Sequence, residues 1–250
     1  MAVGIGGELS WWCPSLDDTG NGTTTLYDLV GTRNGTLTDM DAATDWVADT
    51  ASGGVRALDF DGNNDRVAIG THSEFGSTIL SISAWIKPST TSGSDKAIVS
   101  QVNSAGTIGR AMRRSLTRIT WTVANSGFRV WQTGTTITTD WQHIAISSNG
   151  INTPLIWRNG VAQTVSLAAS SGTPTVPAAQ ELSIGYDGGF ISTLYNFPGL
   201  IDDVRIFNTE LTLTQVQKLA SKRGYQPGVA RCRLNDGLFN RGLFNAGLAR

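Results

Sequence analysis

The chain has 250 residues, is 16% charged and 40% hydrophobic, carries a formal net charge of −1, and contains 29 Gly and two Cys. This length suits one large all-β domain or two small ones, and the near-neutral charge removes the electrostatic case for a nucleic-acid or membrane-surface protein. Two cysteines are too few for a disulfide framework or a zinc ribbon, and low charge with aromatic residues present excludes wholesale disorder.

The start of the chain, Met1 to Glu8, has no basic region and no apolar stretch of signal-peptide length. We therefore expect no membrane insertion and either a mature form or a protein assembled inside the cell that makes it, and the retained Met1 favours the second. Eleven acidic residues and two arginines fall in the first 65 positions, whereas the last 30 hold six basic residues and one acid. Such an asymmetry can pair the tail of one copy with the front of the next, or both ends can simply be solvated.

Alternation of apolar and polar residues dominates the chain, and helical periodicity is scarce. In the run 80–87 the aliphatic residues share one face and Trp85 lies on the other, and Phe128 and Val130 share the face opposite Trp131. Strands are expected at 80–87, 119–123, 128–131, 141–146, 182–186 and 204–206, with Asn-Gly and Asp-Gly turn signals between them. Many short strands at this spacing predict an all-β, two-sheet antiparallel sandwich.

One short helix is expected near the C-terminus. Thr212 can cap it, Gln215 completes a capping box, and Val216, Leu219 and Ala220 form a small apolar stripe. We expect this helix to seal one end of the sandwich.

The tail at 225–250 differs in character, because Gly-Leu-Phe-Asn recurs in it with a five-residue period. Regular Gly opposes a helix and a period of five destroys strand alternation, so we expect an extended arm. Its apolar side chains favour burial, either on their own domain or on a neighbouring subunit. The predicted assembly residues are Leu238, Phe239, Leu243, Phe244 and Leu248. Cys232 in the tail either bridges to Cys13 or stays reduced, and the sequence leaves this open.

Five sequence blocks stand in order along the chain: ALDFDGNNDRV at 57–67, ISAWIKP at 82–88, WQHIAI at 141–146, RNGV at 158–161 and GLIDDVRIFN at 199–208. Together they resemble the concanavalin A-like lectin/glucanase superfamily, specifically its laminin-G-like jelly rolls, from about Leu9 to Ala220. The resemblance implies a jelly roll of two sheets packed face to face over 1–224, with the concave sheet under loops, followed by the tail at 225–250.

Because this superfamily includes β-glucanases, catalysis has to be considered. Retaining glycosidases place two carboxyl groups about 5–5.5 Å apart, and their relatives of this fold carry Glu-x-Asp-x-Glu on one strand. The glutamates here are isolated, at Glu8, Glu74, Glu181 and Glu210. Asp202 and Asp203 are adjacent, so on a regular strand they point to opposite faces. We therefore predict that the protein is not an enzyme, with His143 in a structural role beside Trp141.

The resemblance also implies a structural Ca²⁺ at the sandwich edge, because relatives often bind calcium with an Asp of the last strand. Asp202 matches that position and Asp59 is the expected second ligand, since hard oxygen ligands in a loop-rich site suit calcium. The alternative is that Asp202 only accepts backbone N–H hydrogen bonds from a neighbouring loop.

Recognition of sugars is the usual role in the family, and it uses an aromatic face together with amide and charged groups. The expected concave platform consists of Trp85, Trp131 and His143, with Arg129 as a further ligand contact. The alternative is that these aromatic residues cover the core. Four arginines between 110 and 118 form the densest basic cluster, which we expect to be a solvated hairpin or to form salt bridges with an acidic neighbour.

These patterns favour a non-catalytic jelly roll on the surface of a multisubunit particle, such as a phage virion decoration or tail component. It would assemble in the cytoplasm through its C-terminal arm, as a homo-oligomer or with other subunits, and would also be able to bind glycans. A carbohydrate-binding module or adhesin at a cell surface is the first alternative, and a divergent glycoside hydrolase is the second.

Overall fold

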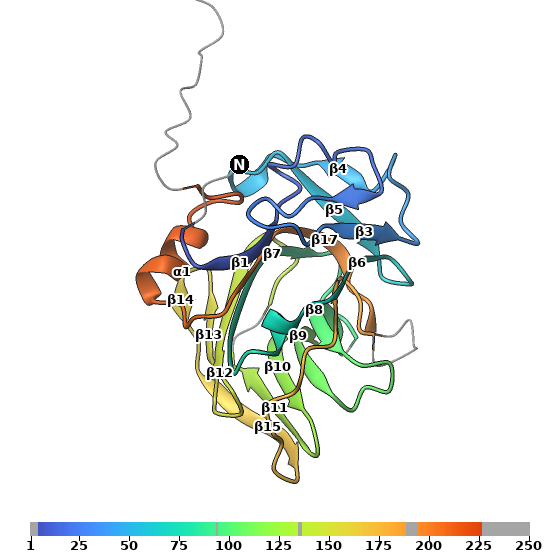
Figure 1. The fold of residues 1–250 in the computed structure, drawn as a ribbon. Coiled ribbons are helices and arrows are strands. Elements are labelled where there is room, and N and C mark those ends of the chain that lie inside the picture. The colour runs from blue at the N-terminus through green and yellow to red at the C-terminus, as the bar shows by residue number, and fades with distance from the viewer. Residues whose placement is uncertain (1–4, 94, 135–136, 189–194, 227–250) are drawn as a thin grey trace, which may run out of the picture.

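The computed structural model describes residues 5–93, 95–134, 137–188 and 195–226. Within these ranges the chain forms two antiparallel sheets, of eight and nine strands, that pack face to face (Figure 1). This is the predicted all-β sandwich, and the strands expected between 80 and 206 are present. The predicted arm and Cys232 lie outside the described residues, so assembly through the arm stays a prediction.

The eight-stranded sheet has β7 and β17 at its centre, and β1 pairs with β17 beside the main strand path. Its strands in spatial order are β14 (Val161–Ala162), β13 (Leu155–Arg158), β12 (Gln142–Asn149), β7 (Ile79–Pro88), β17 (Pro198–Phe207), β5 (Arg56–Asp61) and β4 (Trp46–Ala48), with β1 (Glu8–Trp12) off the path.

The nine-stranded sheet is the other layer, and short 3-10 helices at Ala51–Gly53 and Ser73–Gly76 lie in the connections. Its strands in spatial order are β15 (Val165–Ser171), β11 (Phe128–Thr133), β10 (Arg118–Ala124), β9 (Gly109–Ser115), β8 (Lys96–Val102), β16 (Glu181–Ile184), β6 (Arg66–Thr71), β3 (Gly35–Thr38) and β2 (Thr25–Leu26).

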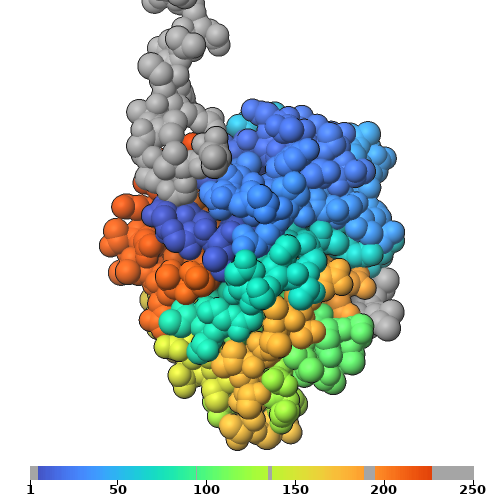
Figure 2. Space-filling view, in the orientation of Figure 1, coloured from blue at the N-terminus to red at the C-terminus, as the bar shows by residue number. Residues whose placement is uncertain are grey.

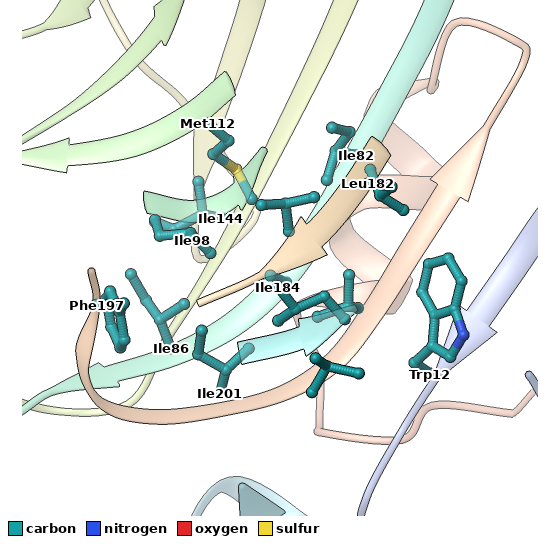
Figure 3. Close-up of a cluster of buried hydrophobic side chains, with 14 of the residues drawn as sticks. Trp12, Ile82, Ile86, Ile98, Met112, Ile144, Leu182, Ile184, Phe197 and Ile201 are labelled. Carbon is teal, nitrogen blue, oxygen red and sulfur yellow. The ribbon is translucent and has the colours of Figure 1, made fainter. Parts of the chain in front are cut away.

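The core lies between the two sheets and is built from the aliphatic rows that the alternation predicted. Ile82, Ile86 and Ile144 come from the eight-stranded sheet, and they meet Met112 and Leu182 from the nine-stranded sheet (Figure 3). All five are at most 2% exposed. Burying one such side chain contributes roughly 1.5–3 kcal/mol, so this layer is the main source of stability.

The predicted helix, α1 (Leu213–Leu219), covers the outer face of the eight-stranded sheet and does not seal an end of the sandwich. Its capping box is present, because the Thr212 side chain accepts from the Gln215 backbone N–H and the Gln215 side chain accepts from that of Thr212. Val216 and Leu219 pack in a second apolar cluster with Trp157 of β13. The part of the outer face that lies beneath α1 is therefore buried as well.

Residues 224–225, near the end of the described chain, are clamped to the eight-stranded sheet by Arg205. Its guanidinium lies over the Trp11 ring at 3.7 Å, forms an ion pair with Asp203, and donates to the Tyr225 carbonyl at 2.7 Å. Gly224 N–H donates to the Asp203 carboxylate at 2.8 Å. In Figure 2 the C-terminal part of the described chain, in orange, lies beside the N-terminal part in dark blue. Residues 224–225, which precede the tail, are therefore held in a fixed position on the eight-stranded sheet.

Candidate functional site

Two cavities lie on the outer face of the nine-stranded sheet, on either side of the loop 103–108 between β8 and β9. The first, here called the polar cavity, has a volume of about 440 Å³ and is lined by Arg66, Thr71, Val102, Asn103, Ser104, Gln180, Glu181, Ser183, Tyr186 and Gly188. The second, here called the aromatic cavity, has a volume of about 510 Å³ and is lined by Asp95, Gly106, Thr107, Arg113, Thr122, Ala124, Ser126, Gly127, Phe128, Val130 and Tyr195.

The floor of the aromatic cavity follows from strand alternation on β10 and β11. Trp121 of β10 points into the core, so its neighbours Thr122 and Ala124 point outward. Phe128 pairs with Ala124 and Val130 pairs with Thr122, which puts two apolar side chains of β11 beside them. Phe128 is 39% exposed. The cavity therefore offers an exposed aromatic ring on the outer face of the nine-stranded sheet.

Polar groups of the aromatic cavity are held by a buried ion pair. Arg113 Nε donates to Asp187 Oδ2 at 2.5 Å, and Arg113 Nη1 donates to the Thr122 hydroxyl at 2.8 Å. Asp187 is fully buried in the segment between the two cavities. Because a guanidinium has a rigid fork of donors, this pair fixes the position of Arg113 at the cavity wall.

The polar cavity has a different chemistry. Arg66 lies over the Tyr186 ring at 5.1 Å and forms an ion pair with Asp39 at 2.7 Å. The shared loop is pinned by Asn103, whose side-chain oxygen accepts from the backbone N–H groups of Thr107 and Ile108 at 2.9 and 3.0 Å. Both cavities thus share a loop that is ordered by its own hydrogen bonds.

The expected position of Trp131 on an outer platform is wrong. Trp131 pairs with Trp121 on the neighbouring strand, belongs to the core cluster between the sheets, and is 3% exposed. The phase of β11 is the reverse of the prediction, since Phe128 and Val130 face outward. Arg129 is half-buried and donates to the Ile151 carbonyl at 2.8 Å.

Trp85 and His143 come together, but not as part of an open platform. They are paired on β7 and β12, with ring centroids 5.6 Å apart, and are 5% and 0% exposed. Trp85 Nε1 donates to the Leu219 carbonyl of α1 at 3.2 Å, which shows that the helix covers them. They also lie on the opposite sheet from Trp131, so the predicted three-residue platform does not form.

His143 is fully buried, as expected for a structural residue, and its ring contacts that of Trp85. Within the described residues neither ring nitrogen has a hydrogen-bond partner. Burial lowers the pKa of His143 to about 3, so the ring is neutral at physiological pH.

The basic cluster is not the solvated hairpin that the sequence suggested. Arg110, Arg113 and Arg114 are buried, and Arg118 is exposed. Arg114 donates to backbone carbonyls of the loop after β7 and of the β9–β10 turn, and Arg113 forms the salt bridge with an acidic neighbour that was the alternative. Only Arg113 of the three buried arginines lines a cavity.

The proposed calcium ligands do not form one site. Asp59 is exposed on β5, whereas Asp202 is fully buried, with Oδ2 2.5 Å from the Ser15 hydroxyl and Oδ1 accepting from backbone N–H groups of Ser15 and Asp203. Acceptance of backbone N–H bonds was the alternative role for Asp202. The described residues contain no group of three His, Cys, Asp or Glu side chains able to hold a metal ion. Asp59 and Asp202 therefore do not fit calcium as a pair.

Asp202 and Asp203 also depart from the expected opposite orientation, because β17 has a register shift after Asp202 and Asp203 has a φ of 52°. Burial raises the pKa of the nearby Cys13 thiol, and both carboxylates add to that effect. Both carboxylates are at most 2% exposed, away from either cavity. Among the described lining residues, the free acids of the cavities are Glu181 in the polar cavity and Asp95 in the aromatic one.

The fold and the sequence blocks agree with a known family. A laminin-G family model described as concanavalin A-like lectin/glucanases superfamily matches residues 61–217, more than half of the chain. The chain belongs to this superfamily. A comparison with curated protein sequences finds no match.

Solved structures similar to this superfamily member include several domains with jelly-roll folds. Domain 4 of AbnA, a GH43 extracellular arabinanase from Geobacillus stearothermophilus, in complex with arabinotriose, is 20% identical with a TM-score of 0.62, and the match covers 88% of this chain and 100% of that one. The receptor binding domain of botulinum neurotoxin C/D mosaic serotype is 16% identical with a TM-score of 0.61, covering 86% of this chain and 51% of that one.

A third structure, Trypanosoma rangeli sialidase in complex with 2,3-difluorosialic acid, is 11% identical with a TM-score of 0.54. The match covers 87% of this chain but 33% of the sialidase chain. At these identities the likeness shows the fold alone. Of the helices in the described ranges, none has the length and apolar character that a bilayer crossing requires.

Proposed function

We propose that this superfamily member is a non-catalytic carbohydrate-binding jelly roll that holds a glycan in the aromatic cavity and the adjoining polar cavity. The observation that carries the proposal is the exposed Phe128 ring in an open cavity that also presents Arg113 and Thr122. A pyranose or furanose ring stacks its apolar C–H side on an aromatic face, while hydroxyl and guanidinium groups bind the sugar hydroxyls.

The rest of the surface supports the choice of this face. Helix α1 covers the outer face of the eight-stranded sheet around Trp85, Ala145 and Trp157, so a ligand has no access to that part of the sheet. The two cavities lie on either side of the loop 103–108, and their volumes of about 440 and 510 Å³ leave room for a sugar unit in each. The free carboxylates, Glu181 and Asp95, line separate cavities, which favours binding over glycoside hydrolysis by a carboxyl pair about 5–10 Å apart.

The similar structures add support of a general kind. The AbnA domain was solved with arabinotriose, and the neurotoxin domain is described as receptor binding. A neutral oligosaccharide such as arabinotriose is therefore the first ligand to test, followed by an array of microbial and sialylated glycans.

The deciding experiment compares Phe128→Ala with Tyr27→Ala. Tyr27 is 37% exposed and Phe128 is 39% exposed, but Tyr27 lines neither cavity, so it is a matched control. We expect Phe128→Ala to weaken glycan binding about 10-fold by titration calorimetry, as loss of one stacking contact implies, and Tyr27→Ala to leave it unchanged. A blank glycan array, or a Phe128→Ala variant that binds as well as wild type, contradicts the proposal.

A second candidate is a component of a multisubunit particle, such as a virion surface, that assembles through residues 225–250. The hydrogen bonds that hold Gly224 and Tyr225 on the eight-stranded sheet favour this candidate. An arm that packs on a neighbouring subunit has to leave its own domain from a fixed position. The test is the mass of the full chain carrying Phe239→Asp and Phe244→Asp, and a mass equal to that of wild type contradicts it. This candidate is compatible with glycan binding.

A further inference from the structure

Arg110 on β9 is a buried cation whose charge is not neutralised by an acidic side chain. It is 2% exposed, and within the described ranges none of the ion pairs formed by Asp and Glu side chains includes it. Burial lowers the pKa of its guanidinium to about 10, so the group stays charged at neutral pH. An isolated charge in such a place is costly unless a counter-charge lies beside it.

The other buried arginines show how this fold usually offsets that cost. Three of them form an ion pair with an aspartate, namely Arg113, Arg205 and Arg223. The terminal nitrogens of Arg114 donate to three backbone carbonyl groups. Arg110 has neither arrangement, because its hydrogen bond within the described residues runs from Nη1 to the Ser77 carbonyl at 2.7 Å.

The unpartnered donors of Arg110 lie on one edge of its guanidinium. Nε and Nη2 have no hydrogen-bond partner among the described residues. In a guanidinium these two nitrogens direct parallel N–H bonds to the same side, and this edge binds anions through two hydrogen bonds. Arg110 therefore presents a complete anion-binding edge inside the sandwich, while its Nη1 is held by Ser77.

A further donor stands opposite Arg110 on the neighbouring strand. Gln101 of β8 is the direct antiparallel partner of Arg110, and both share the face of Val99 and Met112, which belong to the core between the sheets. Gln101 is also 2% exposed, and its Nε2 has no hydrogen-bond partner in the described part of the chain. Two neighbouring side chains thus supply three buried donor nitrogens on one face.

We propose that Arg110 and Gln101 bind a small monovalent anion, the chloride of physiological salt, at the inner face of the nine-stranded sheet. A single negative charge matches the single buried positive charge, and N–H donors are the groups that an anion requires. Water can accept the same hydrogen bonds but does not neutralise the charge. Chloride suits the site better than a larger or multiply charged anion, because the next cross-strand neighbours, Val123 and Leu182, are apolar.

The anion site is separate from both cavities but lies near the loop that they share. Arg110 and Gln101 line neither cavity, since they point to the opposite face of the sheet. One residue pair, Val102 with Gly109, separates them from the loop 103–108. A bound anion would therefore hold β8 and β9 together at the base of this loop. This inference does not depend on glycan binding.

The first test measures urea unfolding of the full chain while chloride replaces gluconate at constant ionic strength. For wild type we expect the folded-to-unfolded equilibrium constant to rise about 11-fold at a chloride concentration ten times the Kd. Arg110→Met replaces the charge with an apolar chain and is expected to lose this rise. Arg118→Met removes the same charge from an exposed position on β10 and is expected to keep it.

Bromide provides a second readout that does not depend on the folding of a variant. In crystals of wild type grown in bromide, we expect an anomalous scattering peak beside Nε and Nη2 of Arg110. A chloride effect of equal size in wild type and Arg110→Met overturns the proposal, because it is then a general salt effect. So does a wild type whose stability is unchanged by chloride, or a crystal in which only water or the Gln101 amide oxygen lies on this edge of the guanidinium.

Discussion

The buried carboxylate of Asp202 makes the stability of the fold depend on pH. It is fully buried, and its Oδ2 lies 2.5 Å from a Ser15 hydroxyl that also contacts the Arg56 carbonyl at 2.8 Å. Burial, followed by the charge of Asp203, raises the pKa of Asp202 from 3.8 to about 6. The folded protein therefore favours the protonated acid, and ionisation works against folding.

The sign and size of the effect follow from this shift. A group whose pKa is higher in the folded state contributes stability that is fully present below its unfolded pKa of 3.8 and is lost as pH rises through about 6. A shift of about two pH units corresponds to about 3 kcal/mol. We therefore expect the Asp202 contribution to the free energy of unfolding to fall by about 3 kcal/mol between about pH 4 and pH 7.

The perturbation is Asp202→Asn, which keeps an oxygen for the Ser15 and Asp203 N–H groups but does not ionise. Urea unfolding of both proteins in reducing buffer, at several pH values between about 4 and 7, gives the comparison. The variant should lose about 3 kcal/mol less than wild type over this range. Asp65, whose pKa burial also raises to about 6, is present in both proteins, so the difference isolates Asp202. Equal pH dependence of the free energy of unfolding in the two proteins would refute the reasoning. In that case the variant would differ from wild type by the same amount at every pH, and ionisation of Asp202 would not oppose folding.

Two further predictions concern α1 and the surface it covers. Thr212→Ala removes the cap of α1 and should lower the free energy of unfolding by about 1 kcal/mol in urea, whereas Thr173→Ala in an exposed loop should change it little. The ring signals of His143 should not shift in NMR spectra between about pH 5 and pH 8, because burial lowers its pKa to about 3. A titration of His143 near neutral pH would show that α1 does not exclude water from it.

The fold could be predicted from the sequence where one apolar row faces one core. The alternation in β7 placed Ile82 and Ile86 correctly, and Thr212 with Gln215 identified the start of α1. These signals are local, and each depends on residues only a few positions apart. The five sequence blocks predicted the jelly-roll arrangement of the strands, because their order already indicated the superfamily to which the chain belongs.

The candidate site could not be predicted in the same way. β11 has large side chains on both faces, so alternation alone does not say whether Phe128 or Trp131 points inward. Its pairing with Trp121 on β10 decides this, and pairing is not a local property. On β7 the outer face holds Ser81 and Ser83 beside Trp85, and its only charged residue is Lys87 near the end of the strand, which was a usable signal that another element covers the middle of this face.

The clamp formed by Arg205 has a practical consequence for attaching the protein to a support. It fixes Tyr225 on the eight-stranded sheet, while both cavities open on the far side of the other sheet. A bead, fluorophore or sensor chip coupled at Tyr225 would then leave Phe128 directed toward the solution. Coupling near Leu167, by contrast, would place the support on the strand next to β11, which carries Phe128.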